Sequence, residues 1–200
     1  FLTIKSLSFL KKEKISYLIS TGGYMSVPLC FAAKILSIKI FLIEPNIVLG
    51  RANKFFLNFS EKLLCYSENL INFPKKFEQK KIIIKPLIRK KYYEIKNYNK
   101  KDNLFTIIII GGSQGASIFD SMMKETLVKI SSICSLKVIH QTSEENISSL
   151  KRFYEENKIE HKVFFYNQNL NDDLIQSDLC ITRGGASSLS EISLLNIPFI

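Results

Sequence analysis

Short apolar runs alternate along the chain with longer stretches in which apolar residues recur at helical spacing. Strands that alternate with helices predict parallel sheets, because a parallel strand pair needs a crossover connection. The strands are nearly unbroken runs of Ile, Leu and Val, which predicts that helices cover both faces of each sheet. The predicted strands are residues 15–19, 39–43, 63–66, 82–84, 105–110, 136–140, 163–166 and 179–182.

Segments with helical periodicity lie between many of these strands. Pro28 favours a helix start, because the first helical turn does not use its missing N–H group. The predicted helices are residues 28–36, 51–59, 117–130, 144–156, 170–176 and 187–195.

One polar, charged segment, residues 90–103 (KKYYEIKNYNKKDN), interrupts this alternation and shows no clear period. Such composition is typical of a linker between domains. We therefore divide the chain into residues 1–92, a linker over residues 93–103, and residues 104–200. The chain begins with Phe1 rather than Met and ends within an apolar run, so we expect both halves to be incomplete.

The composition is that of a globular protein, with 46% hydrophobic and 23% charged residues. No apolar run reaches the roughly 18–20 residues that a membrane-spanning helix needs. The four cysteines are widely separated and form no CxxC pair, and the two histidines share no ligand spacing with them. We expect free thiols and no metal site.

The formal net charge of +10 allows three interpretations. The lysines can form a solvated surface, which we rank first, or they can attract an anionic membrane, which we rank second. Lys11, Lys12 and Lys14, beside Phe9 and Leu10, are the first candidates for membrane contact. Nucleic acid ranks third, because we identify no basic run interleaved with exposed aromatic residues, and we expect no nucleic acid partner.

Three glycine-containing turns directly follow predicted strands: TGGY at 21–24, GGSQGA at 111–116 and RGGASS at 183–188. Ligands of open parallel sheets bind beyond the carboxyl ends of the strands, where glycine lets backbone N–H groups approach a phosphate. Glycine also serves tight turns for steric reasons alone, and for any one turn taken singly we rank that alternative first. The second turn lacks the GK[ST] ending of a Walker loop and the GxGxxG pattern of nicotinamide enzymes.

Several polar residues near these turns have both a structural and a functional interpretation. Ser113 could contact a phosphate or cap the following helix. Glu191 could accept hydrogen bonds from a ribose diol or complement the helix dipole. Arg89 and Arg183, in a lysine-rich chain, indicate either bidentate recognition or surface charge. For His140 a packed core position ranks above a general base, because no acidic partner is evident in the sequence.

Five segments, which together cover nearly the whole chain in order, carry a family resemblance: TGGYMSVP, FLIEPNIVLGRANKFF, IIIIGGSQGAS, IHQTSEE and DLCITRGGASSLSEISLLNIPFI. GGSQGA followed by an RxGAxxxxE element is the specific part, and the other segments support it. Together these segments resemble the bacterial lipid I N-acetylglucosaminyltransferases.

The resemblance implies an α/β GT-B glycosyltransferase fold with two Rossmann-like parallel-sheet domains, both incomplete here. Residues 1–92 would be the C-terminal part of the acceptor-binding domain, and residues 104–200 the N-terminal part of the UDP-GlcNAc-binding domain. The implied enzyme is an inverting hexosyltransferase that needs no metal or cofactor. It would move GlcNAc from UDP-GlcNAc to the muramyl 4-hydroxyl of lipid I (undecaprenyl-pyrophosphoryl-MurNAc-peptide), forming lipid II. It would act as a peripheral protein on the anionic cytoplasmic face of the bacterial inner membrane.

The resemblance also implies roles for individual residues. Ser113 would contact the UDP diphosphate, Arg89 the uracil side, the Asn167 backbone the uracil, and Asn46 the donor sugar. The segment that would hold the nucleotide, with Glu191 on the ribose, is Ala186, Ser187, Ser188, Leu189, Ser190 and Glu191. The residues that would face the acceptor are Gly22, Gly23 and Tyr24.

Glu44 and Tyr24 are the catalytic candidates within this chain. The sequence departs from the family pattern at Ser20, Val27 and Pro45, and residues 86–89 read PLIR rather than the usual Asn-Pro-Val-Arg. The family's first glycine loop, with its histidine, would precede Phe1, and its glutamine pair would follow Ile200. We therefore expect the general base to lie outside these residues and the chain alone to be inactive.

Three alternatives remain open. The chain could come from another GT-B enzyme, either a glycolipid glycosyltransferase or a UDP-sugar epimerase. It could be a non-catalytic nucleotide-binding remnant that binds UDP without turnover. It could be an anion-binding module for nucleic acid, an alternative that rests on charge alone.

Overall fold

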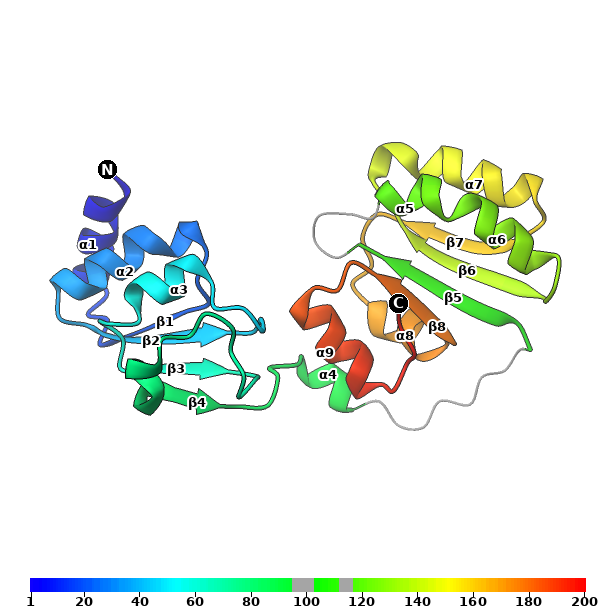
Figure 1. Ribbon diagram of the computed structural model, residues 1–200. Helices are drawn as coiled ribbons and strands as arrows, with labels where there is room; N and C mark the ends of the chain where they lie inside the picture. Colours follow the sequence, from blue (N-terminus) through cyan, green and yellow to red (C-terminus); the bar gives the residue numbers. More distant parts are fainter. Residues whose placement is uncertain (95–102, 112–116) are drawn as a thin grey trace. The chain divides into compact units, whose positions relative to one another are not determined.

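The computed structural model describes residues 1–94, 103–111 and 117–200. The chain divides into two compact units, Phe1–Pro86 and Leu87–Ile200, each with a parallel sheet and helices (Figure 1). Each unit is described by itself.

The first unit contains a four-stranded parallel sheet in the order β1-β2-β3-β4. Its strands are β1 Tyr17–Ser20, β2 Lys39–Glu44, β3 Lys62–Cys65 and β4 Lys81–Ile83. Its helices are α1 Leu2–Lys12, α2 Val27–Ile35 and α3 Arg51–Phe56, with 3-10 helices at Tyr24–Ser26 and Lys75–Lys80.

Helices cover one face of the first sheet. Burial alternates along its strands, so that Ile40 and Leu42 are sealed in the core whereas Tyr17 and Ile19 are 61% and 66% exposed. Figure 1 shows α1, α2 and α3 on the same side of the sheet. The prediction that both faces are covered is therefore wrong for the described part of this unit, because all three helices pack on the face that carries Leu42.

The second unit contains a four-stranded parallel sheet in the order β7-β6-β5-β8. Its strands are β5 Phe105–Ile110, β6 Leu136–Gln141, β7 Glu160–Phe164 and β8 Leu179–Thr182. Its helices are α4 Lys90–Tyr93, α5 Ser117–Met122, α6 Lys124–Ser131, α7 Ile147–Glu156, α8 Leu170–Ile175 and α9 Ala186–Leu194, with a 3-10 helix at Glu144–Asn146.

Both faces of the second sheet are buried, as predicted. Ile107 and Ile109 of β5 join a core cluster with α6 and α7. Ile108 and Ile110 point to the other face and pack with residues of α4, α8 and α9. The strand run of four isoleucines is thus explained by burial on two sides.

The observed elements differ from the predicted ones at a few places. All eight predicted strands are present, with ends shifted by a few residues. The predicted helix over residues 117–130 is divided at Met123 into α5 and α6. Helix α1 was not predicted; Leu7 and Leu10 on its inner face pack into the first core.

The boundary between the units also differs from the predicted end of the first half at residue 92. The contact boundary follows Pro86, and α4 belongs to the second unit. The reason is Tyr92, which is 2% exposed and packs with Ile108 and Ile192. Most of the predicted linker, residues 95–102, lies outside the described residues.

Two further expectations concern membranes and cysteines. Nowhere in the described ranges is a helix both long and apolar enough to cross a bilayer. All four cysteines are free thiols, and Cys30, Cys65 and Cys180 are buried. Burial raises the pKa of the Cys180 thiol to about 12, so it is protonated and unreactive at neutral pH.

Candidate functional site

A cavity of about 430 Å³ opens where strands of the second sheet end. Ile110, Gln141 and Phe164 are at or next to the carboxyl ends of β5, β6 and β7, and each lines this cavity. This edge is where open parallel sheets bind ligands. The other lining residues are Leu87, Arg89, Tyr166, Asn167, Leu170, Ser187, Ser188 and Glu191.

Arg89 and Glu191 form a bidentate ion pair at this cavity. Arg89 Nε donates to Glu191 Oε1 at 2.8 Å, and Nη2 donates to Oε2 at 3.0 Å. Nη2 also donates to the Tyr92 hydroxyl at 3.0 Å, and the guanidinium lies over the Tyr92 ring. The hydrogen bond to Glu191 raises the pKa of Arg89. Arg89 therefore has the planar, bidentate geometry that lysine cannot provide.

The ion pair leaves hydrogen-bonding capacity for a ligand. Two of the roughly four lone-pair positions of the Glu191 carboxylate accept from Arg89, so others can accept from ligand hydroxyls. Arg89 Nη1 has no partner within the described part of the chain, and it can donate. An acceptor and a donor held side by side suit a ribose diol next to a base carbonyl.

The first turn of α9 contributes backbone N–H groups to the same region. Gly185 is the N-cap and offers no side chain, so the amides of Ala186, Ser187 and Ser188 have no acceptor within the helix. Free amides at a helix start bind phosphate oxygens. Of the predicted nucleotide segment, Ser187, Ser188 and Glu191 line the cavity.

Three other residues of that segment are not in the cavity wall. Ser190 Oγ donates to the Ala186 carbonyl at 2.8 Å, within the helix. Leu189 packs beside Gly184. The residues of α9 that line the cavity are therefore Ser187, Ser188 and Glu191.

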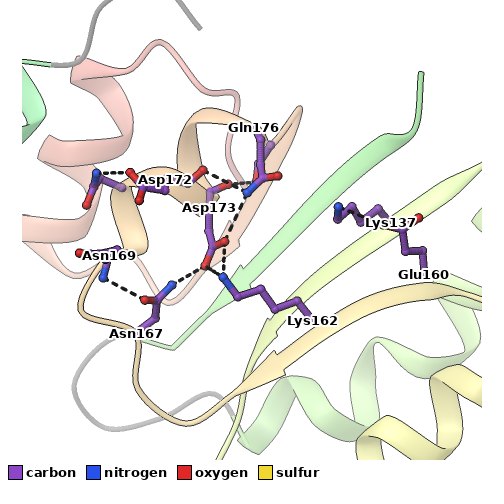
Figure 2. Close-up of polar contacts among 10 residues, drawn as sticks. Lys137, Glu160, Lys162, Asn167, Asn169, Asp172, Asp173 and Gln176 are labelled. Carbon is purple, nitrogen blue, oxygen red and sulfur yellow. Dashed lines mark hydrogen bonds and ion pairs between the residues drawn. The ribbon is translucent and has the colours of Figure 1, made fainter. Parts of the chain in front are cut away.

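Asp173 fixes the loop that carries Asn167 (Figure 2). Asp173 is 2% exposed, and its carboxylate accepts from Lys162 Nζ at 2.6 and 2.8 Å and from Asn167 Nδ2. Asn167 Oδ1 in turn accepts from the Asn169 amide at 2.9 Å. With its side chain used in this way, Asn167 offers a ligand its backbone. Sequence reasoning missed Asp173, because an acidic residue in the first turn of a helix is an ordinary signal.

Gln141 connects two of the loops around the cavity. Its Oε1 accepts from the Gly111 amide at 3.2 Å, and its Nε2 donates to the Phe165 carbonyl at 3.3 Å. Gly111 begins the second glycine turn, so Gln141 holds its first residue next to the β7 loop. Ser113, predicted to contact a diphosphate, lies outside the described residues.

His140 is a core residue behind the cavity, as the preferred interpretation predicted. Its ring is fully buried, with Nδ1 2.7 Å from the Tyr154 hydroxyl and Nε2 3.4 Å from Asp120 Oδ1. Burial lowers the pKa of His140 to about 4, so the ring is neutral at pH 7. Asp120 also accepts from Thr142 Oγ1 at 2.6 Å and from Asn146 Nδ2 at 2.8 Å. Asp120 is thus the acidic partner that the sequence did not reveal, and it ties α5 to the end of β6.

In the first unit, Glu44 organises the loop after β2. The carboxylate is 2% exposed and accepts from the amide of Gly50 at 2.8 Å and from Asn53 Nδ2 at 2.9 Å. It also accepts from the Asn46 amide and side chain at 3.2 and 3.0 Å. A sealed carboxylate with both oxygens engaged is poorly placed to remove a proton, so the geometry argues against Glu44 as the base.

Asn53 joins this loop to the first glycine turn. Gly22 has a φ of +79°, and a Cβ there would lie 2.9 Å from the Asn53 side chain. Asn53 is 1% exposed and donates both to Glu44 and to the Ile43 carbonyl. Gly22, Glu44 and Asn46, all predicted site residues, are therefore brought together by Asn53, which sequence reasoning missed.

Tyr24 is 83% exposed and begins a 3-10 helix directly after Gly23. Among the described residues no carboxylate or imidazole is hydrogen-bonded to its hydroxyl, so no neighbouring group is placed to accept a proton from it. Within the same described ranges, no three His, Cys, Asp or Glu side chains converge to hold a metal ion.

Comparison with known proteins places both units in one family. Residues 2–65 match the glycosyltransferase family 28 N-terminal domain, and residues 106–200 match the family 28 C-terminal domain. A curated relative from Pelagibacter ubique is 46% identical over 200 residues, covering all of this chain and 56% of the relative. Its name is UDP-N-acetylglucosamine--N-acetylmuramyl-(pentapeptide) pyrophosphoryl-undecaprenol N-acetylglucosamine transferase. The chain thus spans little more than half the length of such relatives.

Solved structures share the fold at low sequence identity. The crystal structure of Acinetobacter baumannii MurG has a TM-score of 0.71 at 21% identity, covering 96% of this chain and 53% of that one. UDP-GlcNAc 2-epimerase from Neisseria meningitidis, bound to UDP-GlcNAc, has a TM-score of 0.69 at 10% identity, covering 100% and 62%. These likenesses support the α/β GT-B architecture alone. Together with the two domain matches, they lead to one conclusion: the chain belongs to glycosyltransferase family 28.

Proposed function

We propose that the protein of which this chain is part transfers GlcNAc from UDP-GlcNAc to the muramyl 4-hydroxyl of lipid I, forming lipid II for peptidoglycan. The observation that carries the proposal is the cavity of the second unit. It combines the Arg89–Glu191 pair, the free amides of α9 and the fixed Asn167 loop. The reaction is the one for which the Pelagibacter ubique relative is named.

The donor nucleotide would bind in that cavity. Glu191 would accept hydrogen bonds from the ribose hydroxyls, and Arg89 would donate toward the uracil side. The backbone of Asn167 would lie beside the uracil ring, and the α9 amides would face the diphosphate. Ser113 and Asn46 stay predictions as contacts to the diphosphate and the donor sugar.

The reaction would be a single displacement at the anomeric carbon. The muramyl 4-hydroxyl oxygen forms a bond to C1 of GlcNAc while the bond from C1 to the β-phosphate oxygen breaks. The electron pair of that bond leaves with UDP, the hydroxyl proton passes to a base, and C1 inverts to a β linkage. Amides and the helix dipole at α9 would stabilise charge on the leaving diphosphate.

We expect the general base of the reaction to be a residue other than Glu44 or Tyr24. Glu44 would act by positioning the loop of residues 45–50, since its oxygens already accept several hydrogen bonds. Tyr24 would contact the acceptor together with Gly22 and Gly23.

Calorimetric titration of UDP tests the donor site directly. Glu191→Ala should weaken UDP binding by about 1–3 kcal/mol, because a charged hydrogen-bond partner is lost. Glu160→Ala is the matched control, because Glu160 pairs with Lys137 on the β6–β7 surface and does not line the cavity (Figure 2). Equal UDP affinity in the Glu191 variant and the wild type would remove Glu191 from the site.

Product analysis separates the transferase from the epimerase that the fold also allows. The whole protein, incubated with labelled UDP-GlcNAc and a lipid I analogue, should transfer label to the lipid and release UDP. With donor alone, an epimerase would convert UDP-GlcNAc to its 2-epimer. Epimer formation without any labelled lipid would overturn the proposed activity.

We also propose that the protein binds the anionic cytoplasmic face of the inner membrane through α1. Phe1, Ile4 and Phe9 on the outer side of this helix are 86%, 69% and 55% exposed, beside exposed Lys12. Apolar and basic side chains on one helix face favour binding to anionic lipid. Leu10, next to the candidate lysines, is buried in the first core and does not belong to this surface.

Vesicle co-sedimentation tests the membrane proposal. Lys12→Ala should weaken binding to anionic vesicles about fivefold, since each lysine near the surface contributes about 1 kcal/mol. Lys151→Ala, which makes the same change on α7 of the second unit, should have less effect. Binding that is insensitive to salt and to anionic lipid content would contradict the proposal.

A further inference from the structure

A second cavity, of about 580 Å³, lies in the first unit beside the glycine turn of residues 21–24. Its wall is formed by α2, by the start of α3 and by the residues that follow Gly22. Apart from Arg51 and the Tyr24 hydroxyl, the side chains that line it are apolar. The lining residues are Gly23, Tyr24, Val27, Phe31, Gly50, Arg51, Ala52 and Phe55.

Aromatic side chains form the floor and one rim of this cavity. Phe31 packs against Phe55 at 5.6 Å and against Phe56 at 5.1 Å between ring centroids. Phe56 is 1% exposed and fixes this group to the core, whereas Phe55 is 56% exposed. An aromatic base with one large exposed ring offers apolar surface to an apolar ligand.

The positive charge of Arg51, at the rim of the cavity, has no acidic partner in the described ranges. Arg51 is exposed, and it has no hydrogen bond or ion pair with any residue in the described ranges. It lines the same cavity as Gly23, whose φ is +79° and where an added Cβ would meet nothing within 4 Å. A guanidinium beside an open glycine turn is complementary to a phosphate group.

We propose that this cavity binds the first isoprene units of a polyprenyl diphosphate, with Arg51 and the Gly23 turn at the diphosphate. The inference rests on the proposed function and assigns a subsite for the acceptor's lipid part. The diphosphate and the polyprenyl chain are adjacent in such a molecule, as the cationic rim and the apolar floor are here. A headgroup of a bulk phospholipid would not reproduce this arrangement, because its glycerol backbone separates the phosphate from the acyl chains.

Calorimetry on the whole 200-residue chain can test the subsite without any turnover. The probes are farnesyl diphosphate, inorganic pyrophosphate and farnesol. We expect farnesyl diphosphate to bind about tenfold or more tightly than pyrophosphate, because burying each CH₂ contributes about 0.8 kcal/mol. Farnesol, which lacks the diphosphate, should bind more weakly than farnesyl diphosphate.

Two variants test the apolar part and the diphosphate-binding part of the subsite separately. Phe55→Ala should weaken farnesyl diphosphate about tenfold and leave pyrophosphate unchanged, whereas Arg51→Ala should weaken both. Phe59→Ala is the matched control, because Phe59 is 38% exposed in the same unit but does not line the cavity. Equal affinities for farnesyl diphosphate and pyrophosphate, or no effect of Phe55→Ala, would overturn the proposal.

A UDP titration of the same samples distinguishes this proposal from the proposed function. If UDP binds and depends on Glu191 but farnesyl diphosphate does not bind, the subsite is wrong and the donor site stands. If farnesyl diphosphate binds with the expected variant pattern but UDP does not, the donor site fails and the lipid subsite stands. Vesicles of phosphatidylglycerol that compete fully with farnesyl diphosphate would assign the cavity to bulk lipid and overturn the proposal.

Discussion

Three acidic side chains that are nearly sealed from water each hold a loop in place. Glu44, Asp173 and Glu191 are 2%, 2% and 8% exposed, and each carboxylate accepts at least two hydrogen bonds. Buried carboxylates persist only when such partners offset the loss of water. At the scale of the residue, the two candidate sites therefore depend on acids that position other groups.

Asp173→Ala should loosen the β7 loop. It removes the acceptor for Lys162 and Asn167, so we expect the free energy of unfolding to fall by about 1–3 kcal/mol in urea denaturation. UDP affinity should fall as well, because the Asn167 backbone is no longer fixed. Asp172→Ala is the control, since Asp172 is an exposed neighbour on the same helix. Equal losses in both variants would contradict a special role for Asp173.

His140 makes stability depend on pH in a defined window. Its folded pKa of about 4 lies below the ordinary value of 6.5, so between these values the unfolded chain binds the extra proton. Stability therefore rises with pH across this window and is lost as pH falls from 6.5 toward 4, by roughly 3 kcal/mol. Urea denaturation at several pH values should show this slope in wild type and a smaller slope in His140→Phe. An unchanged slope in that variant would assign the effect to other groups.

At the scale of the element, the side-chain amide of Asn53 packs the first glycine turn against the loop after β2. Gly22 and Gly23 have the same φ of +79°, but only at Gly22 would a Cβ collide with Asn53. The two glycines thus separate the effect of backbone strain from the effect of close packing.

A double-mutant cycle tests this packing. Gly22→Ala should destabilise the first unit more than Gly23→Ala, since both introduce strain at positive φ but only the former adds a clash. Combined with Asn53→Ala, Gly22→Ala should lose part of its effect, because the space is vacated. A coupling of about 1 kcal/mol or more is expected for Gly22 and near zero for Gly23. Additive losses at Gly22 would show that Asn53 does not limit this turn.

At the scale of the whole molecule, each unit has its own core. The first cluster contains buried residues from Leu10 to Leu70, and the second unit's clusters contain residues from Tyr92 to Ile197. In the described ranges no buried residue belongs to cores of both units. We therefore expect the units to unfold separately.

Two truncations test this division. Residues 87–200 should fold alone, measured by cooperative thermal unfolding, and should bind UDP as the whole chain does. Residues 93–200 lack Arg89 and Tyr92, which leaves buried Glu191 without its cation and opens the core beside Ile108. This shorter piece should bind UDP at least about tenfold more weakly and be less stable. Similar behaviour of both pieces would place the functional boundary at residue 92 instead.

The local pattern of apolar and polar residues in the sequence was enough to predict the strands, most of the helices and the fold class. Runs such as Phe105–Ile110 and the glycines after them are set by nearest neighbours in the chain, so their period and composition can be read directly. The same is true of the glycine turns as ligand-binding candidates, and the family motifs added predicted roles for Arg89 and Glu191. A helix such as α4 escaped notice, because four residues are too few to show a period.

Contacts between distant residues were decided only by the tertiary structure. Arg89 and Glu191 are 102 positions apart, so no local spacing could show that they form one bidentate pair. The burial of Glu44 by Asn53, and of Asp173 by Lys162, likewise depends on which elements pack together. Whether a carboxylate reacts or positions its neighbours is set by the donors around it, and those donors arrive from other parts of the chain.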